Sequence, residues 1–184
     1  RQEAHNLIAW GALESFGSQP ALLARLKVKI APSAQLALFP DELNKSQPAP
    51  SGEEWSLAEK VAAQEQVLGA SLEAHPLELH APAITASRAL TTVEAAARLG
   101  QAVRVAGMRQ TWRRSRTRRG ESIYFMALED LEGMLDVVIP GTVYQHCRQA
   151  LRGPGPYLIE GTVELSAAAG EPEIRAARIT SLVD

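Results

Sequence analysis

The sequence has one cysteine, Cys147, and no apolar run of the length that a membrane helix needs. A single cysteine excludes a disulfide within the chain and indicates a reducing compartment. A helix that crosses a bilayer needs about 20 consecutive apolar residues, so the sequence predicts no membrane contact. The start, Arg1, shows no signal-peptide pattern. We therefore expect a cytoplasmic chain, and we interpret it as a piece of a longer polypeptide.

Signals for catalysis and metal binding are also scarce. The four histidines show no zinc spacing, and no glycine-rich loop occurs that would cradle a phosphate. Asp130 and Glu132 have the spacing of a metal-binding pair, but they fall in a predicted turn, where acidic residues are common, so we interpret them as structural. The sequence therefore predicts no catalytic residue, no metal site and no cofactor in this chain.

Positive charge, in contrast, is concentrated in one segment. The whole chain carries 19 basic and 21 acidic residues and a net charge of −2, yet residues 101–119 hold seven arginines and no carboxylate. That segment is +7, which leaves −9 for the remainder. A local cluster of this kind is typical of a binding site for a polyanion. The alternative is a solvated hairpin whose arginines pair with carboxylates of this chain or of a neighbouring domain.

Six of these arginines surround a tryptophan, Trp112. They are Arg109, Arg113, Arg114, Arg116, Arg118 and Arg119. So many guanidinium groups cannot be buried together, because each needs its own partner or water. We expect them to project around the indole, which offers a face on which a base can stack. Tyr124 is a second candidate stacking surface. Packing of Trp112 across its own hairpin is an equal alternative.

Helical signals precede the strand signals. The expected helices are 1–16, 21–28, 56–75 and 91–99. Capping-box patterns begin the last two, with Ser56 and Thr91 as N-caps. Gly17, Pro76 and Gly100 are the expected stops. Proline, serine and glycine between the second and third helices predict a flexible linker.

After Gly100 the apolar period changes from helical to strand-like. The expected elements are strands at 103–107, 123–128 and 135–139, a helix at 143–151, and strands at 157–165 and 173–182. This order is that of an OB-fold, a five-stranded Greek-key barrel, which binds nucleic acid on strands 2 and 3 and the flanking loops. The arginine run falls in the expected loop between strands 1 and 2, so its position and its charge agree.

These signals predict an α+β protein in four parts. The parts are the end of a helical domain at 1–39, a linker at 40–54, a helical connector at 55–100 and an OB-fold nucleic-acid-binding domain at 101–184. Nucleic acid is therefore the partner that the residues alone indicate.

Four stretches, taken in order, resemble the C-terminal region of the alpha subunit of bacterial DNA polymerase III. They are LIAWGALESFG at 7–17, LGASLEAHPL at 68–77, TRRG at 117–120 with LEDLEG at 128–133, and GPYLIEG at 155–161. The resemblance covers nearly the whole chain. It implies a replicative DNA-directed DNA polymerase in the bacterial cytoplasm, in contact with other replicase subunits. The palm residues that hold two Mg²⁺ ions in such enzymes are expected elsewhere in the parent chain.

A pentapeptide, Gln35-Leu36-Ala37-Leu38-Phe39, resembles the motif with which this family and other replication proteins hold the sliding clamp. The adjacent side chains of Leu38 and Phe39 can fill a partner's pocket as an anchor, while Gln35 hydrogen-bonds at the other end. The alternative is that Leu36, Leu38 and Phe39 cover the local helices.

We therefore expect a non-catalytic segment that acts in DNA replication. It would bind single-stranded template DNA through the arginine run and the sliding clamp through the pentapeptide. Two alternatives stay open. One is the same region of an error-prone alpha-subunit paralogue in translesion repair. The other is an RNA- or tRNA-binding OB-fold module, which would leave residues 1–80 unexplained.

Overall fold

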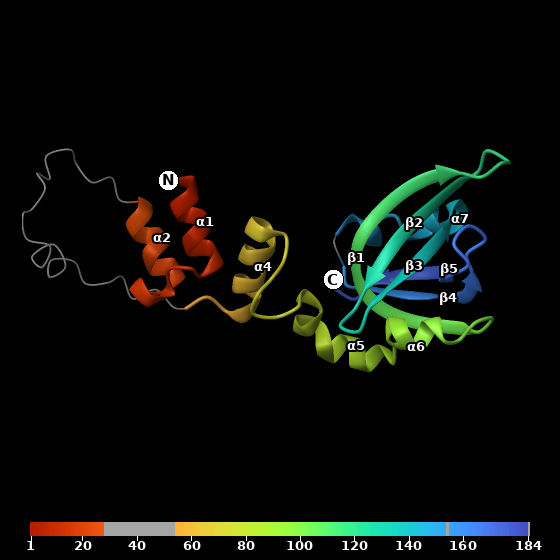
Figure 1. The fold of residues 1–184 in the computed structure, drawn as a ribbon, viewed down its shortest axis with the longest axis horizontal. Coiled ribbons are helices and arrows are strands. Elements are labelled where there is room, and N and C mark those ends of the chain that lie inside the picture. Colours follow the sequence, from red (N-terminus) through yellow and green to blue (C-terminus); the bar gives the residue numbers. More distant parts are fainter. Residues whose placement is uncertain (28–53, 154, 184) are drawn as a thin grey trace, which may run out of the picture. The chain divides into compact units, whose positions relative to one another are not determined.

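The computed structural model of the chain describes residues 1–27, 54–153 and 155–183. The chain forms two compact units, Arg1–Pro76 and Leu77–Asp184 (Figure 1). The segment expected as a single helical connector, 55–100, is shared between them. Among the described helices, none has both the length and the apolar character that a membrane crossing requires.

The unit Arg1–Pro76 is helical. Its described elements are α1 (Gln2–Trp10), the 3-10 helix η1 (Glu14–Phe16), α2 (Gln19–Lys27) and α4 (Leu57–Leu68). Helix α1 is shorter than expected because Gly11, with φ of 98°, ends it in the left-handed conformation that glycine adopts at little cost. Helix α4 begins at the predicted capping box of Ser56 and Glu59 but ends at Gly69, well before Pro76.

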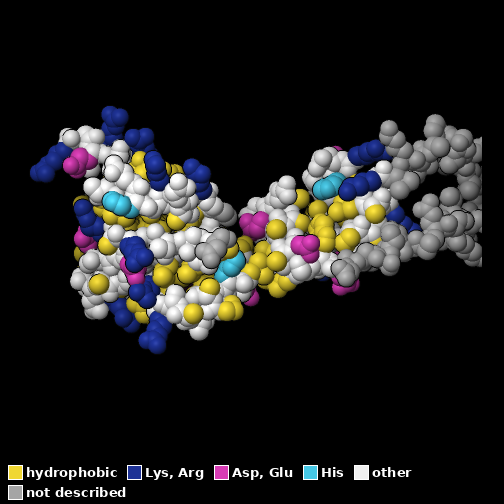
Figure 2. All heavy atoms as spheres, turned by 180° about the vertical axis from the view of Figure 1, so that it is seen from behind, with side chains coloured by type: hydrophobic (Ala, Val, Ile, Leu, Met, Phe, Trp, Pro, Cys, Tyr) yellow, Lys and Arg dark blue, Asp and Glu magenta, His cyan; other side chains and the backbone are white. Residues whose placement is uncertain are grey.

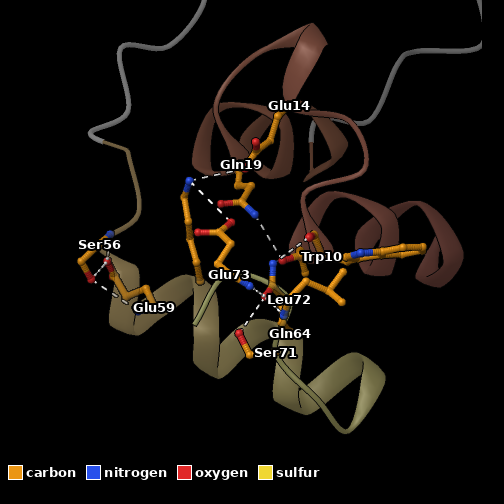
Figure 3. Close-up of polar contacts among 11 residues, drawn as sticks. Trp10, Glu14, Gln19, Ser56, Glu59, Gln64, Ser71, Leu72 and Glu73 are labelled. Carbon is orange, nitrogen blue, oxygen red and sulfur yellow. Dashed lines mark hydrogen bonds and ion pairs between the residues drawn. The ribbon is translucent and has the colours of Figure 1, made fainter. Parts of the chain in front are cut away.

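A buried glutamine organises this unit. Gln64 is 2% exposed, and its Nε2 donates a hydrogen bond of 3.1 Å to the carbonyl oxygen of Trp10. Its Oε1 accepts from the hydroxyl of Ser71 at 2.9 Å and from the backbone N–H of Leu72 at 2.8 Å (Figure 3). A buried amide without partners would destabilise the fold, so these bonds fix the end of α1 to α4 and to the turn that follows it.

The strands of the second unit close into a barrel. They are β1 (Ala102–Arg116), β2 (Ser122–Glu129), β3 (Met134–Pro140), β4 (Tyr157–Leu165) and β5 (Pro172–Ser181). Their order around the barrel is β1-β2-β3-β5-β4 (Figure 1). Only the pair β3–β5 is parallel, and the other four pairs are antiparallel. This is the topology of the OB-fold, so the predicted α+β class and barrel are confirmed.

Short helices accompany the barrel. They are η2 (Pro76–His80), α5 (Ala81–Ser87), α6 (Thr92–Ala96), α7 (Gly141–Cys147) and η3 (Ala150–Arg152). The predicted capping box of Thr91 and Glu94 begins α6, but the helix ends at Ala96 rather than before Gly100. The helix expected at 143–151 is divided into α7 and η3 between β3 and β4.

The core fills the inside of the barrel. Its fully buried side chains include Val105, Leu128, Val137, Ile139, Ile159, Val163 and Ile174. A glycine allows β4 and β5 to approach at a bulge after Glu160: a Cβ atom at Gly161 would lie 2.3 Å from the carbonyl oxygen of Arg175. No side chain larger than hydrogen fits at that distance, which explains why this strand interior carries a glycine.

The turn between β2 and β3 is tied to α6 by Asp130. Its carboxylate accepts hydrogen bonds from the backbone N–H of Thr92 at 2.6 Å and from the Thr92 hydroxyl at 2.8 Å. It also accepts from the N–H groups of Glu132 and Gly133, both at 2.9 Å. Both carboxylate oxygens therefore serve the fold, as the turn pattern predicted. Within the described ranges, no group of three or more acidic, histidine or cysteine side chains is placed to hold a metal ion.

Candidate nucleic-acid interface

The arginine run lies in a strand rather than in the expected loop. β1 continues to Arg116, and only Arg118 and Arg119 lie in the turn before β2. Pairing with β2 extends from Met108 opposite Glu129 to Arg116 opposite Ser122. The prediction was wrong because a run of charged residues gives no strand signal of its own. The apolar partner strand supplies the cross-strand contacts that make it one.

Strand geometry divides the arginines between two faces. Side chains alternate along a strand, and directly paired residues of antiparallel strands share a face. Arg114 pairs with Tyr124, so it lies, with Trp112 two residues before it, on the face that carries the core. Arg113 pairs with Phe125 on the opposite face, and its guanidinium lies 4.8 Å from the centre of that ring. The run is thus not a single cluster around the indole.

A bulge brings Arg109 to the face of Trp112. The β1–β2 register shifts between Arg109 and Thr111. Because a bulge inserts one extra residue, Arg109 and Trp112 lie on the same face although they are three positions apart. The Arg109 guanidinium lies 5.7 Å from the indole centre and donates a hydrogen bond of 2.8 Å to the carbonyl oxygen of Leu151. Burial raises the pKa of Tyr157, and the nearby charge of Arg109 lowers it in part. Arg109 is therefore partly engaged inside the protein.

Three aromatic rings form a cluster at the root of this hairpin. Tyr124 and Tyr144 stack with ring centres 3.9 Å apart, and Trp112 lies 5.4 Å from the first and 5.8 Å from the second. Trp112 is 37% exposed, so it packs on the cluster and also presents a surface to solvent. Tyr124 is 8% exposed. The prediction that it offers an open stacking surface is wrong, because Tyr144 covers its ring.

None of the six arginines in the run forms an ion pair with a carboxylate of the described residues. The ion pairs of the barrel unit within those residues join Arg104 to Glu160 at 2.5 Å and Arg175 to Glu164 at 4.0 Å. Figure 2 shows dark-blue side chains at the projecting end of this unit. Pairing with acidic groups of this chain therefore does not account for the charge in the described structure.

The basic residues of this unit are of one kind. Residues 77–184 contain thirteen arginines and no lysine, and the four lysines of the chain are Lys27, Lys29, Lys45 and Lys60. A guanidinium donates paired hydrogen bonds to a phosphate and stacks on aromatic faces, whereas an ammonium acts as a point charge. The chemistry of the surface therefore suits a ligand that carries both phosphates and aromatic bases.

A hollow of about 500 Å³ opens beside the aromatic cluster. Arg114 of β1, Arg148 just after α7 and Arg175 of β5 contribute to its lining, together with Tyr124 and Tyr144. Sequence analysis did not identify Arg148, Arg175 or Tyr144. Tyr144 and Arg148 are one helical turn apart at α7, and the closed barrel brings Arg175 of β5 beside them.

The candidate clamp-binding residues Gln35, Leu36, Leu38 and Phe39 lie outside the described residues. The clamp contact therefore stays a prediction from the sequence.

Comparison with known proteins shows the relatives of the chain. No protein-family model matches it. DNA polymerase III subunit alpha of Halalkalibacterium halodurans is 28% identical over 166 residues, which is 86% of this chain and 15% of that protein. The Bacillus subtilis protein of the same name is 27% identical over 188 residues, 97% of this chain and 16% of that protein. An error-prone DNA polymerase of Anaeromyxobacter dehalogenans is 35% identical over 114 residues, 61% of this chain and 10% of that protein.

The homologues of this chain are DNA polymerase III alpha subunits and error-prone DNA polymerases. The family resemblance seen in the sequence is thereby confirmed. This chain spans 16% or less of the length of these polymerases. The matches to the alpha subunits cover up to 97% of the chain, so they include the helical residues that an isolated RNA-binding module would leave unexplained.

Solved structures with a similar barrel are more distant. Asparaginyl-tRNA synthetase from Pyrococcus horikoshii aligns with a TM-score of 0.41 and 19% identity, over 51% of this chain and 22% of that one. The SSB domain of a Synechococcus protein aligns with a TM-score of 0.38 and 16% identity, over 43% and 92%. At these scores the OB-fold assignment rests on the strand order of this chain itself.

Proposed function

We propose that the unit Leu77–Asp184 binds single-stranded template DNA as part of a DNA polymerase III alpha subunit. The observation that carries the proposal is a hairpin of six arginines, none paired with a described carboxylate, beside an aromatic cluster on a closed OB barrel. Polymerase homologues supply the context in which the polyanion is DNA. We assign the nucleotide-transfer chemistry, with its Mg²⁺ ions, to other parts of the parent protein, and the cytoplasm as its compartment.

The geometry suggests different roles for the arginines. Arg116, Arg118 and Arg119 stand at and beyond the end of β1, where they neutralise phosphates of the strand. Arg109 lies over the indole of Trp112 and holds it in position. The exposed part of that indole then receives a base, a contact that contributes about 1–3 kcal/mol.

The dependence of binding on salt tests this proposal. With about four arginines on phosphates, log K for a single strand falls against log salt with a slope of about −3. Replacing Arg116, Arg118 and Arg119 by glutamine should make that slope shallower by about 2, measured by fluorescence anisotropy with a labelled oligonucleotide.

A matched control removes the same charge elsewhere on the unit. Arg88, Arg98 and Arg178 are exposed and belong to none of β1, β2 and the turn between them, and their triple glutamine variant should keep a slope close to that of the unmodified chain. Salt-independent binding, or equal losses in the two triple variants, would refute the proposal.

We also propose that Gln35–Phe39 binds the sliding clamp and so keeps the polymerase near the primer end by effective concentration. The support is the pentapeptide itself, with an aliphatic and an aromatic anchor side by side. Replacing Leu38 and Phe39 by alanine should abolish binding to the clamp and leave affinity for single-stranded DNA unchanged. Loss of both activities would show that the peptide belongs to the folded core.

A second candidate is the corresponding part of an error-prone polymerase. The higher identities, 35%, belong to error-prone relatives, but those matches cover only 60–61% of the chain. Two alpha subunits match 86% and 97% of the chain, and two from Neisseria meningitidis match 66%. The greater coverage favours the replicative role.

A further inference from the structure

We propose that the hollow beside the aromatic cluster holds one nucleotide of the bound strand. The base would lie against Tyr144, and the adjoining phosphates would contact Arg148 and Arg175. This inference rests on the proposed function. It names the place beside the hairpin where one nucleotide of the strand enters the hollow.

The charge of the hollow favours an anion. Three guanidinium groups from separate elements contribute to the lining, and Glu121 is the single carboxylate there among the described residues. Arg148 forms no ion pair within the described ranges. Arg175 has Glu164 at 4.0 Å, with the two side chains 57% and 46% exposed, and exposed pairs of this kind contribute little. Both groups are thus available to a phosphate.

The remaining lining suits a base. Tyr144 is half-buried and held by stacking on Tyr124, so its ring is fixed before a ligand arrives. Thr142 and Gln145, from the same helix α7, line the hollow and offer a hydroxyl and an amide to the polar edge of a base. The volume, about 500 Å³, falls in the range of about 300–1,000 Å³ that small-molecule sites occupy.

Arg114 connects the hollow to the hairpin. It belongs to β1, yet its side chain lines the hollow. It is held in place by a hydrogen bond of 3.1 Å from its Nη2 to the Ser122 hydroxyl and lies 5.8 Å from the ring centre of Tyr124. A strand whose phosphates follow Arg118, Arg119 and Arg116 therefore meets Arg114 next, at the rim of the hollow.

Paired variants of the full chain test the phosphate contacts. In anisotropy titrations with an oligothymidylate, the double variant Arg148→Gln, Arg175→Gln should lower affinity about tenfold at 150 mM salt and make the salt slope about 1.4 shallower, the effect of two lost phosphates. The control, Arg152→Gln with Arg178→Gln, removes the same charge from exposed positions that do not line the hollow. The control variant should change the affinity and the salt slope by no more than about a third as much, because it weakens only the general electrostatic attraction between the chain and the strand.

Photocrosslinking tests the base. An oligothymidylate carrying 5-iododeoxyuridine should crosslink to Tyr144 in the unmodified chain and in Tyr144→Phe, and the α7 crosslink should disappear in Tyr144→Leu. Free thymidine monophosphate and inorganic phosphate serve as competitors. If either displaces the strand from α7 at micromolar concentration, the site is one for a free small anion and the inference is overturned.

The outcomes separate the inference from the proposed function. If the full chain does not bind the oligonucleotide, or binds it without salt dependence, the proposed function fails and the inference fails with it. If binding depends on the hairpin arginines, but the hollow variant behaves like its control and crosslinks fall on Trp112 alone, the inference is overturned and the proposed function stands.

Discussion

Replacing Asp130 by alanine should destabilise the barrel by about 3–5 kcal/mol. The carboxylate accepts two hydrogen bonds from Thr92, at 2.6 and 2.8 Å, and Thr92 is 1% exposed. Each hydrogen bond to a charged group contributes about 1.5–3 kcal/mol, and the alanine variant would leave the two buried Thr92 donors without partners. The N–H groups of Glu132 and Gly133 also lose the carboxylate, but they lie in a turn that water reaches, so we assign them little of the loss.

Asp130→Asn gives a matched comparison. One oxygen of Asp130 accepts from the Thr92 hydroxyl, Glu132 and Gly133, and an asparagine carbonyl can keep these three bonds. The other oxygen accepts from the Thr92 N–H, which would face an NH₂ donor in the variant. The loss should therefore be about 1.5–3 kcal/mol, clearly smaller than in the alanine variant.

Hydrogen exchange measured peptide by peptide is the suitable assay, because it reports the barrel strands separately from the helical unit. Protection of β2 and β3 amides in increasing urea gives the free energy of unfolding of the barrel. An alanine variant within about 1 kcal/mol of the unmodified chain would refute this account of the turn. So would a gain in protection on adding Mg²⁺ to the unmodified chain, which would indicate a metal site at Asp130 and Glu132 instead.

Two further changes probe the packing of the barrel. Gly161→Ala should destabilise it by about 1–3 kcal/mol, because the new Cβ would lie 2.3 Å from the Arg175 carbonyl oxygen; Gly153→Ala, whose nearest neighbour would be 4.0 Å away, is the control, and equal thermal midpoints would contradict the prediction. Burial raises the pKa of the Cys147 thiol, so at any pH the folded chain holds less of the reactive thiolate than the unfolded one. Iodoacetamide should therefore label Cys147 slowly at pH 8 and rapidly in denaturant, and equal rates would contradict its burial.

The sequence predicted the barrel better than it predicted the helices. Strand alternation and the order of elements are sufficient for an OB-fold, and four of the five observed strands lie close to those expected. The exception is β1, which continues to Arg116 through the segment expected as a loop. The end of a helix depends on the backbone conformation of single residues, which the apolar periodicity does not show. Apolar spacing continued past Gly11 to Phe16, but Phe16 is 71% exposed, so that spacing did not indicate burial. Gly69 ended α4 in the same way, although Pro76 gave the stronger stop signal.

The candidate site was also predicted only in part from the sequence. The six arginines were found because they fall within residues 109–119 and dominate the local charge. Their separation onto two faces depends on the β1–β2 register and on a bulge after Arg109, which no local pattern shows. Arg175 of β5 joins Tyr144 and Arg148 of the α7 region only when the barrel closes. Tyr124 was misjudged because alternation cannot tell a ring that faces the core from one that faces solvent.

The absence of lysine from residues 77–184 has a practical consequence for every binding measurement. The side chains of this chain that amine-reactive dyes and crosslinkers can modify are the four lysines, all within residues 1–76, so the barrel keeps its full charge after their labelling. Lysine acetylation cannot alter the affinity of this unit for a polyanion. A modification that removes permanent positive charge from this unit must therefore act on arginine.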